Sequence, residues 1–204
     1  MNWIKHPLTL EGEKVILVPL SEMYFDELID SCRHKIIWTY MPVKANDADG
    51  LRKELTEALL EREKGTQCPF VVIEKTTNKV IGSTRFLKLT EEHRNLEIGW
   101  TWYLPEYWRK GYNEECKLLL LTYCFEILKT IRVQIIASDK NLRSRKAIER
   151  IGGKFEGILR NVVLRHDGPR TTAYYSIIDS EWEEVKANLL LLLQAKIKDG
   201  KDFS

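Results

Sequence analysis

A glycine turn at the head of a long apolar stretch is the feature that most constrains the fold of this chain. The turn lies in YWRKGYNEE (residues 107–115), and apolar residues follow at helical spacing over residues 112–129. The first N–H groups and the positive dipole end of such a helix can hold a phosphate. Further along, NLRSRKAIERIGGKFEG (residues 141–157) supplies a short basic helix that ends at two glycines. The two segments together predict an anion site between two helices.

Length and composition fit one enzyme-sized domain. The 204 residues are 44% hydrophobic and 30% charged, with 32 Lys and Arg against 30 Asp and Glu, which excludes disorder and a strongly basic surface. We expect a single domain over residues 1–198, a flexible tail over 199–204 and no nucleic-acid partner. The N-terminus lacks a signal-peptide core, and the leucines at 189–193 fall far short of the ~20 residues of a membrane span. A cytoplasmic protein without membrane association is expected.

The cysteines and histidines suggest no special chemistry. The four cysteines have no CxxC spacing, and the density typical of small secreted scaffolds is absent, so reduced thiols are expected. Cys116 and Cys124 share the apolar face of one predicted helix, which favours packing over catalysis. The four histidines lack the i, i+4 spacing of a helical metal pair, so no metal site is predicted.

Hydrophobic patterns and turn signals give an order of elements typical of a mixed α+β fold. Strands are expected over residues 15–19, 70–74, 80–89, 95–104, 132–138, 154–165 and 171–178, the last two joined by the turn HDGP. Helices are expected over residues 21–33, 47–64, 112–129, 142–151 and 182–198, and residues 36–42 form an aromatic connection. These elements predict a mostly antiparallel sheet of about seven strands with helices on both faces.

Motifs in the second half of the chain resemble the GNAT superfamily of acyl-CoA N-acyltransferases. The closest resemblance is to the branch of ribosomal-protein N-terminal (RimJ/RimL-type) acetyltransferases. The similar features are the glycine turn in PEYWRKGYNEE, a helix that begins with Asn-x-x-Ser, an "FE" pair late in the preceding helix and an "EG-x-LR" strand. In this sequence the last two are Phe125, Glu126, Glu156, Gly157, Leu159 and Arg160. The resemblance covers roughly residues 8 to 187. It implies a twisted sheet with a splayed parallel strand pair and acetyl-CoA as co-substrate.

The resemblance assigns a coenzyme A site to the two motifs and to the backbone of residues 98–100. The cofactor-binding residues are Ile98, Gly99, Trp100, Arg109, Lys110, Gly111, Tyr112, Asn113, Asn141, Arg143 and Lys146. Asn113 stands where the family has a small residue, and Trp108 where it has Gln or Arg. Asn113 could instead cap the helix and compete for the N–H groups that the phosphate would use. The first-turn acids Glu114 and Glu115 would repel a phosphate, and the basic side chains could be ordinary surface charges.

Acyl transfer to an amine needs a proton acceptor, because only the neutral amine attacks a thioester. Glu97 is the candidate, since it begins the strand that binds the thioester arm in the resembled family. A surface or salt-bridged glutamate is the alternative. Strict alternation places Glu97, Gly99 and Thr101 on one face of this strand and Ile98, Trp100 and Trp102 on the other.

The departing thiolate needs a proton, which many GNAT enzymes take from a tyrosine where this chain has Ile148. Ser144, one helical turn earlier, is the catalytic substitute implied by the resembled branch. Its alternative is a first-turn surface serine. Asn141 either contacts the pantetheine arm or only caps its helix.

Five aromatic residues could shape an acceptor pocket: Trp38, Tyr40, Trp100, Trp102 and Tyr103. Strand aromatics are mostly buried, so only Trp38 and Tyr40, expected in a connection, are substrate-binding candidates. The sequence as a whole predicts an N-acetyltransferase that acts on a small-molecule or peptide amine in a ternary complex. The alternatives are a GNAT-fold protein that binds coenzyme A without transfer, and RNA binding through the basic helix. The leucine-rich last helix leaves room for a homodimer.

Overall fold

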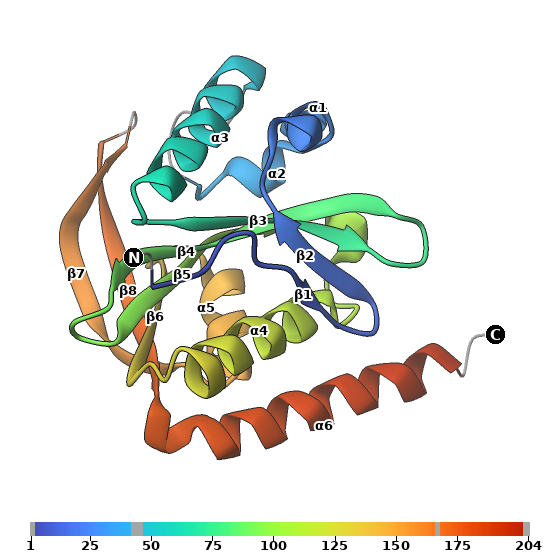
Figure 1. Cartoon of the computed structure of the whole chain (residues 1–204), viewed down its shortest axis with the longest axis vertical. Coiled ribbons are helices and arrows are strands. Elements are labelled where there is room, and N and C mark those ends of the chain that lie inside the picture. The colour runs from blue at the N-terminus through green and yellow to red at the C-terminus, as the bar shows by residue number, and fades with distance from the viewer. Residues whose placement is uncertain (1–2, 42–46, 166–167, 202–204) are drawn as a thin grey trace.

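An eight-stranded sheet in the order β1-β2-β3-β4-β5-β6-β8-β7 forms the centre of the protein (Figure 1). The structure is a computed structural model and describes residues 3–41, 47–165 and 168–201. The strands are β1 Leu10–Glu11, β2 Val15–Pro19, β3 Cys68–Glu74, β4 Lys79–Thr90, β5 Asn95–Tyr103, β6 Arg132–Ser138, β7 Lys154–Arg165 and β8 Gly168–Ile178. Neighbouring strands are antiparallel except β5 and β6, which run parallel. The predicted fold class is confirmed.

The seven predicted strands correspond to β2 through β8, and their bounds shift by a few residues at most. The additional strand β1 pairs with β2, Leu10 opposite Leu17, and is too short to leave a pattern in the sequence. Of the expected HDGP turn, residues 166 and 167 lie outside the described residues.

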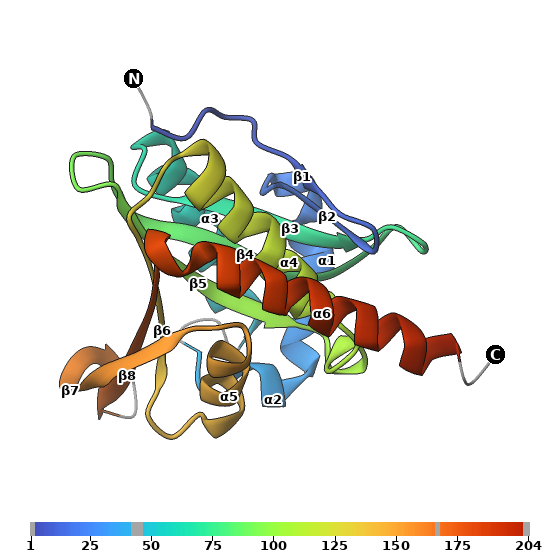
Figure 2. The same ribbon diagram turned by 90° about the horizontal axis from the view of Figure 1, so that it is seen from below.

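Helices cover both faces of the sheet. They are α1 Phe25–Asp30, α2 Lys35–Trp38, α3 Ala48–Glu63, α4 Tyr112–Thr122, α5 Leu142–Arg150 and α6 Trp182–Lys201. Helices α1, α2 and α3 lie on one side, and α4, α5 and α6 lie on the other, where α6 runs along α4 (Figures 1 and 2). The sheet therefore has two apolar cores, one under each helical layer.

Strand β3 explains how both cores form on one sheet. Phe70 and Val72 enter the core beneath α4, whereas Val71 and Ile73 enter the core beneath α1 and α3. Successive side chains of a strand point to opposite faces, so a central strand covered on both faces must be apolar throughout.

Two predicted segments in the first half of the chain differ in the structure. The expected helix over residues 21–33 is broken into the 3₁₀ turn η1 Glu22–Tyr24, helix α1 and the 3₁₀ turn η2 Ser31–Arg33. Ser31 is buried, and its hydroxyl donates to the Leu28 carbonyl at 2.5 Å. This bond favours the 3₁₀ turn that follows the end of α1. The expected connection over residues 36–42 contains α2, and residues 42–46 lie outside the described part of the chain.

The two long helices of the second half also end differently from the prediction. Helix α4 gives way to a π-helical turn, η5 Tyr123–Ile127. Helix α6 continues through Lys201, so residues 199–201 of the predicted tail are helical, and residues 202–204 lie outside the described residues.

Candidate active site

Strands β5 and β6 pair over only three residues and then separate. The paired positions are Asn95 with Arg132, Leu96 with Val133, and Glu97 with Gln134. Beyond Glu97, strand β6 continues to pair with β8 through Ser138, whereas β5 continues to pair with β4. The side of β5 that faces β6 over residues 98–103 therefore has no strand partner among the described residues. This open edge includes the backbone of residues 98–100 that was predicted to hold a thioester arm.

A bulge at Trp100 changes the direction of the side chains in β5. Trp100 has φ +50°, and the pairing with β4 shifts between Gly99 and Trp102. As a result Ile98 lies in the core beneath α4, whereas Trp102 lies in the core beneath α1 and α3. The predicted strict alternation is wrong beyond Gly99, because a bulge inserts one residue and reverses the faces that follow. Thr101 accordingly points toward α4, not to the face of Glu97.

Glu97 occupies the last paired position before the strands separate. Its side chain is buried, and Oε2 accepts hydrogen bonds of 2.8 Å from Lys88 Nζ and 2.8 Å from Gln134 Nε2. A Cβ built on Gly99 would lie 3.3 Å from Glu97 Oε1, so the glycine leaves space beside the carboxylate. The structure thus shows a salt-bridged glutamate that also lies at the start of the open edge.

The glycine turn begins helix α4 without a side-chain cap. Gly111 is the N-cap residue in the left-handed conformation, with φ +90° and ψ −7°. Asn113 therefore does not cap the helix, and the capping alternative is wrong. Among the described residues no acceptor contacts the backbone N–H of Tyr112, Asn113 or Glu114. These donors remain available to an anion.

Both first-turn acids are engaged away from these donors. Glu115 accepts from the backbone N–H groups of Glu13 at 2.5 Å and Lys14 at 3.1 Å, which fixes the turn between β1 and β2. Glu114 is buried and lies 3.6 Å from Arg150 Nε of α5. Since each carboxylate has its own positive partner or amide donors, the repulsion expected toward a phosphate is reduced.

Tyr112 contributes its backbone to the turn and turns its ring elsewhere. Its hydroxyl donates to Glu74 of β3, and its ring meets Tyr107 edge to face with centroids 5.2 Å apart. Burial and the bond to Glu74 raise the pKa of Tyr112, so the phenol stays protonated. Only the main chain of Tyr112 is therefore placed for the predicted cofactor contact.

Basic side chains from two segments meet beside the glycine turn. The Arg143 guanidinium of α5 lies over the Trp108 ring, 3.7 Å from its centroid, and Trp108 Nε1 donates to the Tyr103 carbonyl at 2.8 Å. Burial lowers the pKa of Arg143, and the nearby charge of Arg109 lowers it further. Arg143 and Arg109 thus form a positive rim, and both are exposed, as are Lys110 and Lys146.

Asn141 caps helix α5. Its Oδ1 accepts from the Ser144 backbone N–H at 3.1 Å, so the capping alternative is observed and its side-chain N–H₂ is left over for a ligand. The Ser144 hydroxyl has no protein partner within the described ranges, and Ile148 on the same helix is buried in the core. The structure therefore brings Asn141 and Ser144 to the start of α5 and offers no acid at Ile148.

A family model described as "Acetyltransferase (GNAT) domain" matches residues 14–154, which is more than half of the chain. The chain belongs to the GNAT acetyltransferase family. It is an acyltransferase with the fold of this family, as the sequence predicts.

Known GNAT proteins are similar over most of the chain. A GCN5-related N-acetyltransferase from Brucella melitensis is 27% identical, with a TM-score of 0.82 over 93% of this chain and 86% of that protein. The Bacillus subtilis (strain 168) protein "Putative ribosomal N-acetyltransferase YdaF" is 37% identical over 48% of this chain and 53% of its own length. Mycobacterium smegmatis RimJ, solved in complex with CoA-disulfide, is 17% identical with a TM-score of 0.75 over 91% and 95% of the two chains. The resemblance to the GNAT superfamily is confirmed, and the similarity to YdaF supports the RimJ/RimL-type branch.

The two predicted acceptor-binding residues of this GNAT protein have different environments. Trp38 belongs to α2, is buried, donates from Nε1 to the Ser31 carbonyl at 3.1 Å and packs on Trp102 with centroids 5.4 Å apart. Tyr40 follows the helix and is partly buried. Trp38 is thus part of the core next to β5, and contact with an acceptor stays a prediction for both residues.

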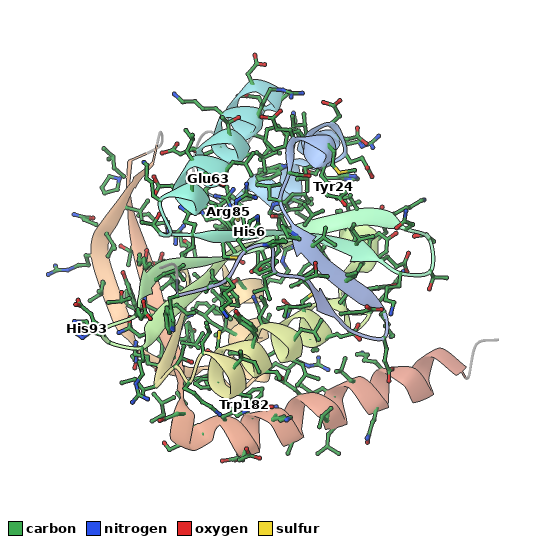
Figure 3. The ribbon with its side chains drawn as sticks, in the orientation of Figure 1. His6, Tyr24, Glu63, Arg85, His93 and Trp182 are labelled. Carbon is green, nitrogen blue, oxygen red and sulfur yellow. The ribbon has the colours of Figure 1, made fainter. Side chains whose placement is uncertain are left out.

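Sequence reasoning misses two buried cations on opposite faces of the GNAT sheet. Arg85 of β4 lies between the sheet and α3, with its guanidinium 4.3 Å from the Trp100 ring centroid (Figure 3). Lys117 of α4 donates from Nζ to Thr101 Oγ1 at 2.9 Å. Lys117 interrupts an apolar run from Cys116 to Leu121, and that interruption is the signal that could identify it, whereas Arg85 follows polar residues and leaves no such signal.

Two kinds of site are not found in the part of the chain that the structure describes. No three His, Cys, Asp or Glu side chains there are grouped to hold a metal ion. Likewise, none of its helices combines the length and apolar composition needed to cross a membrane.

Proposed function

We propose that the protein transfers an acetyl group from acetyl-CoA to a primary amine by direct attack in a ternary complex. The separation of β5 from β6 next to the glycine-headed helix α4 carries this proposal. The open edge of β5 offers main-chain groups to a thioester arm, and the first N–H groups of α4 offer donors to its phosphates. The donor supplies an activated acyl group, and the protein contributes binding, orientation and proton transfer.

The residues near the turn fit an anionic nucleotide. The N–H groups of residues 112–114 have no protein acceptor among the described residues, and Arg109 and Arg143 add positive charge beside them. Arg143 and Lys146 would hold the 3′-phosphate, and the free amide N–H₂ of Asn141 would bond the pantetheine arm. The fold relative RimJ was solved in complex with CoA-disulfide, which supports a coenzyme A ligand for this fold.

Proton transfer would be divided between two side chains. Glu97 at the vertex of the separated strands accepts the proton of the ammonium, directly or through one water, which makes the amine nucleophilic. Ser144 at the start of α5 donates to the departing thiolate, and water can replace it because the thiolate is a weak base. No covalent enzyme intermediate is needed.

The acceptor is a protein N-terminus or a small-molecule amine. The similarity to YdaF, named for a ribosomal substrate, favours peptides with free N-termini. A second candidate function, coenzyme A binding without transfer, is motivated by Ile148, which lies in the core where many family members have their acid.

One pair of measurements separates the two functions. Calorimetry with acetyl-CoA measures binding, and thiol release with panels of peptides, polyamines and small amines measures transfer. Amine-dependent thiol release with acetylated product would establish the transferase. Tight binding of acetyl-CoA without release on any amine would favour the binding protein instead.

A further inference from the structure

Lys117 is a buried cation on the second turn of helix α4. Its residue is only 4% exposed, and it forms no ion pair within the described residues. Nζ donates to Thr101 Oγ1 at 2.9 Å, and Thr101 Oγ1 lies 2.8 Å from Thr84 Oγ1. The ammonium is thus held by one neutral hydroxyl group, that of Thr101 on β5, which is itself bonded to Thr84 on β4.

Such a position is unfavourable for a charge. Burial lowers the pKa of Lys117 to about 8, and the ionisable groups that face it are the thiols of Cys116 on its own helix and of Cys124 on the following turn η5. The ammonium has three N–H donors but only one hydrogen-bond acceptor among the described residues, and the neighbouring Leu120 and Leu121 are fully buried. A leucine would satisfy the core, so packing does not explain a lysine at this position.

The position of its acceptor links Lys117 to the open edge of β5. Thr101 directly follows the bulge residue Trp100, and Thr101 Oγ1 also lies 3.4 Å from the Gly99 carbonyl oxygen. Lys117 therefore supports the same short backbone segment that loses its pairing with β6. Helix α4 carries the phosphate donors at its first turn and this cation close behind them.

We propose that Lys117 is a positioning residue for acyl transfer, whose positive charge beneath the β5 bulge holds the main chain and favours negative charge on the thioester oxygen. This inference rests on the proposed function. When the amine nitrogen bonds to the carbonyl carbon, the C=O electron pair moves to oxygen. It returns as the carbon–sulfur bond breaks and the thiolate leaves. Lys117 exchanges no proton in these steps. It acts through the electric field of its ammonium and through its hydrogen bond to Thr101.

The test uses Lys117→Met, which keeps side-chain length and removes the charge. We expect kcat with a responsive amine to fall about tenfold or more at pH 7, since a charge acting through another residue has less effect than a direct oxyanion donor. The KM for acetyl-CoA should change less than about threefold. The same variant should unfold at an equal or higher temperature, because it removes an unpaired buried charge. If Lys117 had only a structural role, Lys117→Met should unfold at a lower temperature than the wild-type protein. The control variant is Lys53→Met on the exposed surface of α3.

The pH dependence gives a second readout. Lys117 is charged below its pKa of about 8, so the ratio of wild-type to Lys117→Met kcat should be largest at neutral pH and approach one as pH rises above it. Ionisations common to both proteins, such as those of Glu97 and the acceptor, cancel in this ratio. A ratio of one at all pH values overturns the inference while the wild-type activity preserves the proposed function.

If no amine substrate is found, a binding measurement with acetyl-CoA can still test the role of Lys117. The infrared carbonyl band of acetyl-CoA labelled with ¹³C at the thioester carbon should shift to lower frequency in wild-type protein, and less in Lys117→Met. Equal shifts in the two proteins contradict a role for Lys117 and leave acetyl-CoA binding established. Wild-type protein that binds no acetyl-CoA overturns both the proposed function and this inference.

Discussion

The side-chain amide of Gln134 on β6 donates a 2.8 Å hydrogen bond to the Glu97 carboxylate on β5, across the last pair of residues before the two strands separate. The bond joins the two strands at the point where their pairing ends. It also orients a buried carboxylate whose second partner, Lys88, extends into solvent with 63% of its side chain exposed. The carboxylate that we propose as the proton acceptor is thus held from β4 and β6, the strands on either side of β5.

Glu97→Gln tests this carboxylate as a proton acceptor. The substitution keeps the shape and removes the basic oxygen, so we expect kcat to fall about 100-fold at neutral pH, the usual contribution of a general base. The Kd for acetyl-CoA, measured by calorimetry, should stay within about threefold. Lys88→Met is the matched control, since it removes the salt bridge and keeps the carboxylate. Wild-type turnover in the glutamine variant would exclude Glu97 from the mechanism.

Gly111→Ala tests the backbone of the phosphate turn. Gly111 has φ +90°, and the added Cβ would meet Lys196 at an ordinary 3.6 Å, so strain and not overlap determines the effect. An L-residue in the left-handed region is disfavoured by about 1–2 kcal/mol, which should appear in the free energy of unfolding measured with urea. Gly157→Ala is the control, because no atom lies within 4 Å of its new Cβ.

The same pair of variants separates stability from binding. If Gly111→Ala changes the turn, acetyl-CoA should bind more weakly to it than to Gly157→Ala. Gly111→Asn should recover part of the stability, since asparagine enters the left-handed region more easily than alanine. Equal stability and equal affinity in both alanine variants would contradict the assigned turn.

The main elements of this fold can be predicted from sequence because local signals mark them. Strand β6 occupies the residues expected for it, and helix α3 begins directly after Asp47, whose side chain caps it by accepting from Gly50 N at 2.7 Å. The glycine turn is predictable for the same reason, since Gly111 has the positive φ that its position requires.

The details of the site depend on contacts that are distant in sequence. The Glu115 carboxylate binds the backbone of Glu13 and Lys14, which lie 102 and 101 residues away in the sequence. No local sequence signal therefore shows that this carboxylate is already bound and repels a phosphate less. The bulge at Trp100 depends on the register between β4 and β5, and a strand pattern without its partner cannot show it. Both errors arise where tertiary pairing decides the direction of a side chain.

Arg143 provides a test of how the nucleotide is recognised. Its guanidinium lies on the Trp108 ring beside the glycine turn, where it could contact the 3′-phosphate of coenzyme A. Arg143→Leu should raise the Kd for acetyl-CoA about tenfold, which corresponds to one charge-assisted hydrogen bond, and should leave binding of dephospho-acetyl-CoA nearly unchanged. Arg52→Leu on α3 is the control for a loss of surface charge. Equal losses for both ligands would assign Arg143 to packing on Trp108.

Glu126 ties the π-helical turn to helix α6 and makes this contact sensitive to acid. Glu126 Oε1 accepts from Lys186 Nζ at 2.7 Å and from Trp182 Nε1 at 2.9 Å, and Trp182 packs on Phe125 in the core (Figure 3). These bonds, chiefly the one from Lys186, lower the pKa of Glu126 below the ordinary value of 4.5. The carboxylate therefore stabilises the fold above pH 4.5, and this contribution is lost as pH falls through the lowered value.

Glu126→Gln should measure that contribution. Because more than a third of the Glu126 side chain is exposed, we expect a loss of only about 0.5–1 kcal/mol in the free energy of unfolding at pH 7. The difference between wild type and variant should shrink as pH falls below 4.5 and through the lowered pKa, since the wild-type carboxyl group is protonated first in the unfolded state and then in the folded state. Urea unfolding at neutral and acidic pH checks this, with Glu183→Gln on the exposed side of α6 as control. A difference that does not depend on pH would show that Glu126 stabilises α6 through packing and neutral hydrogen bonds, not through its charge.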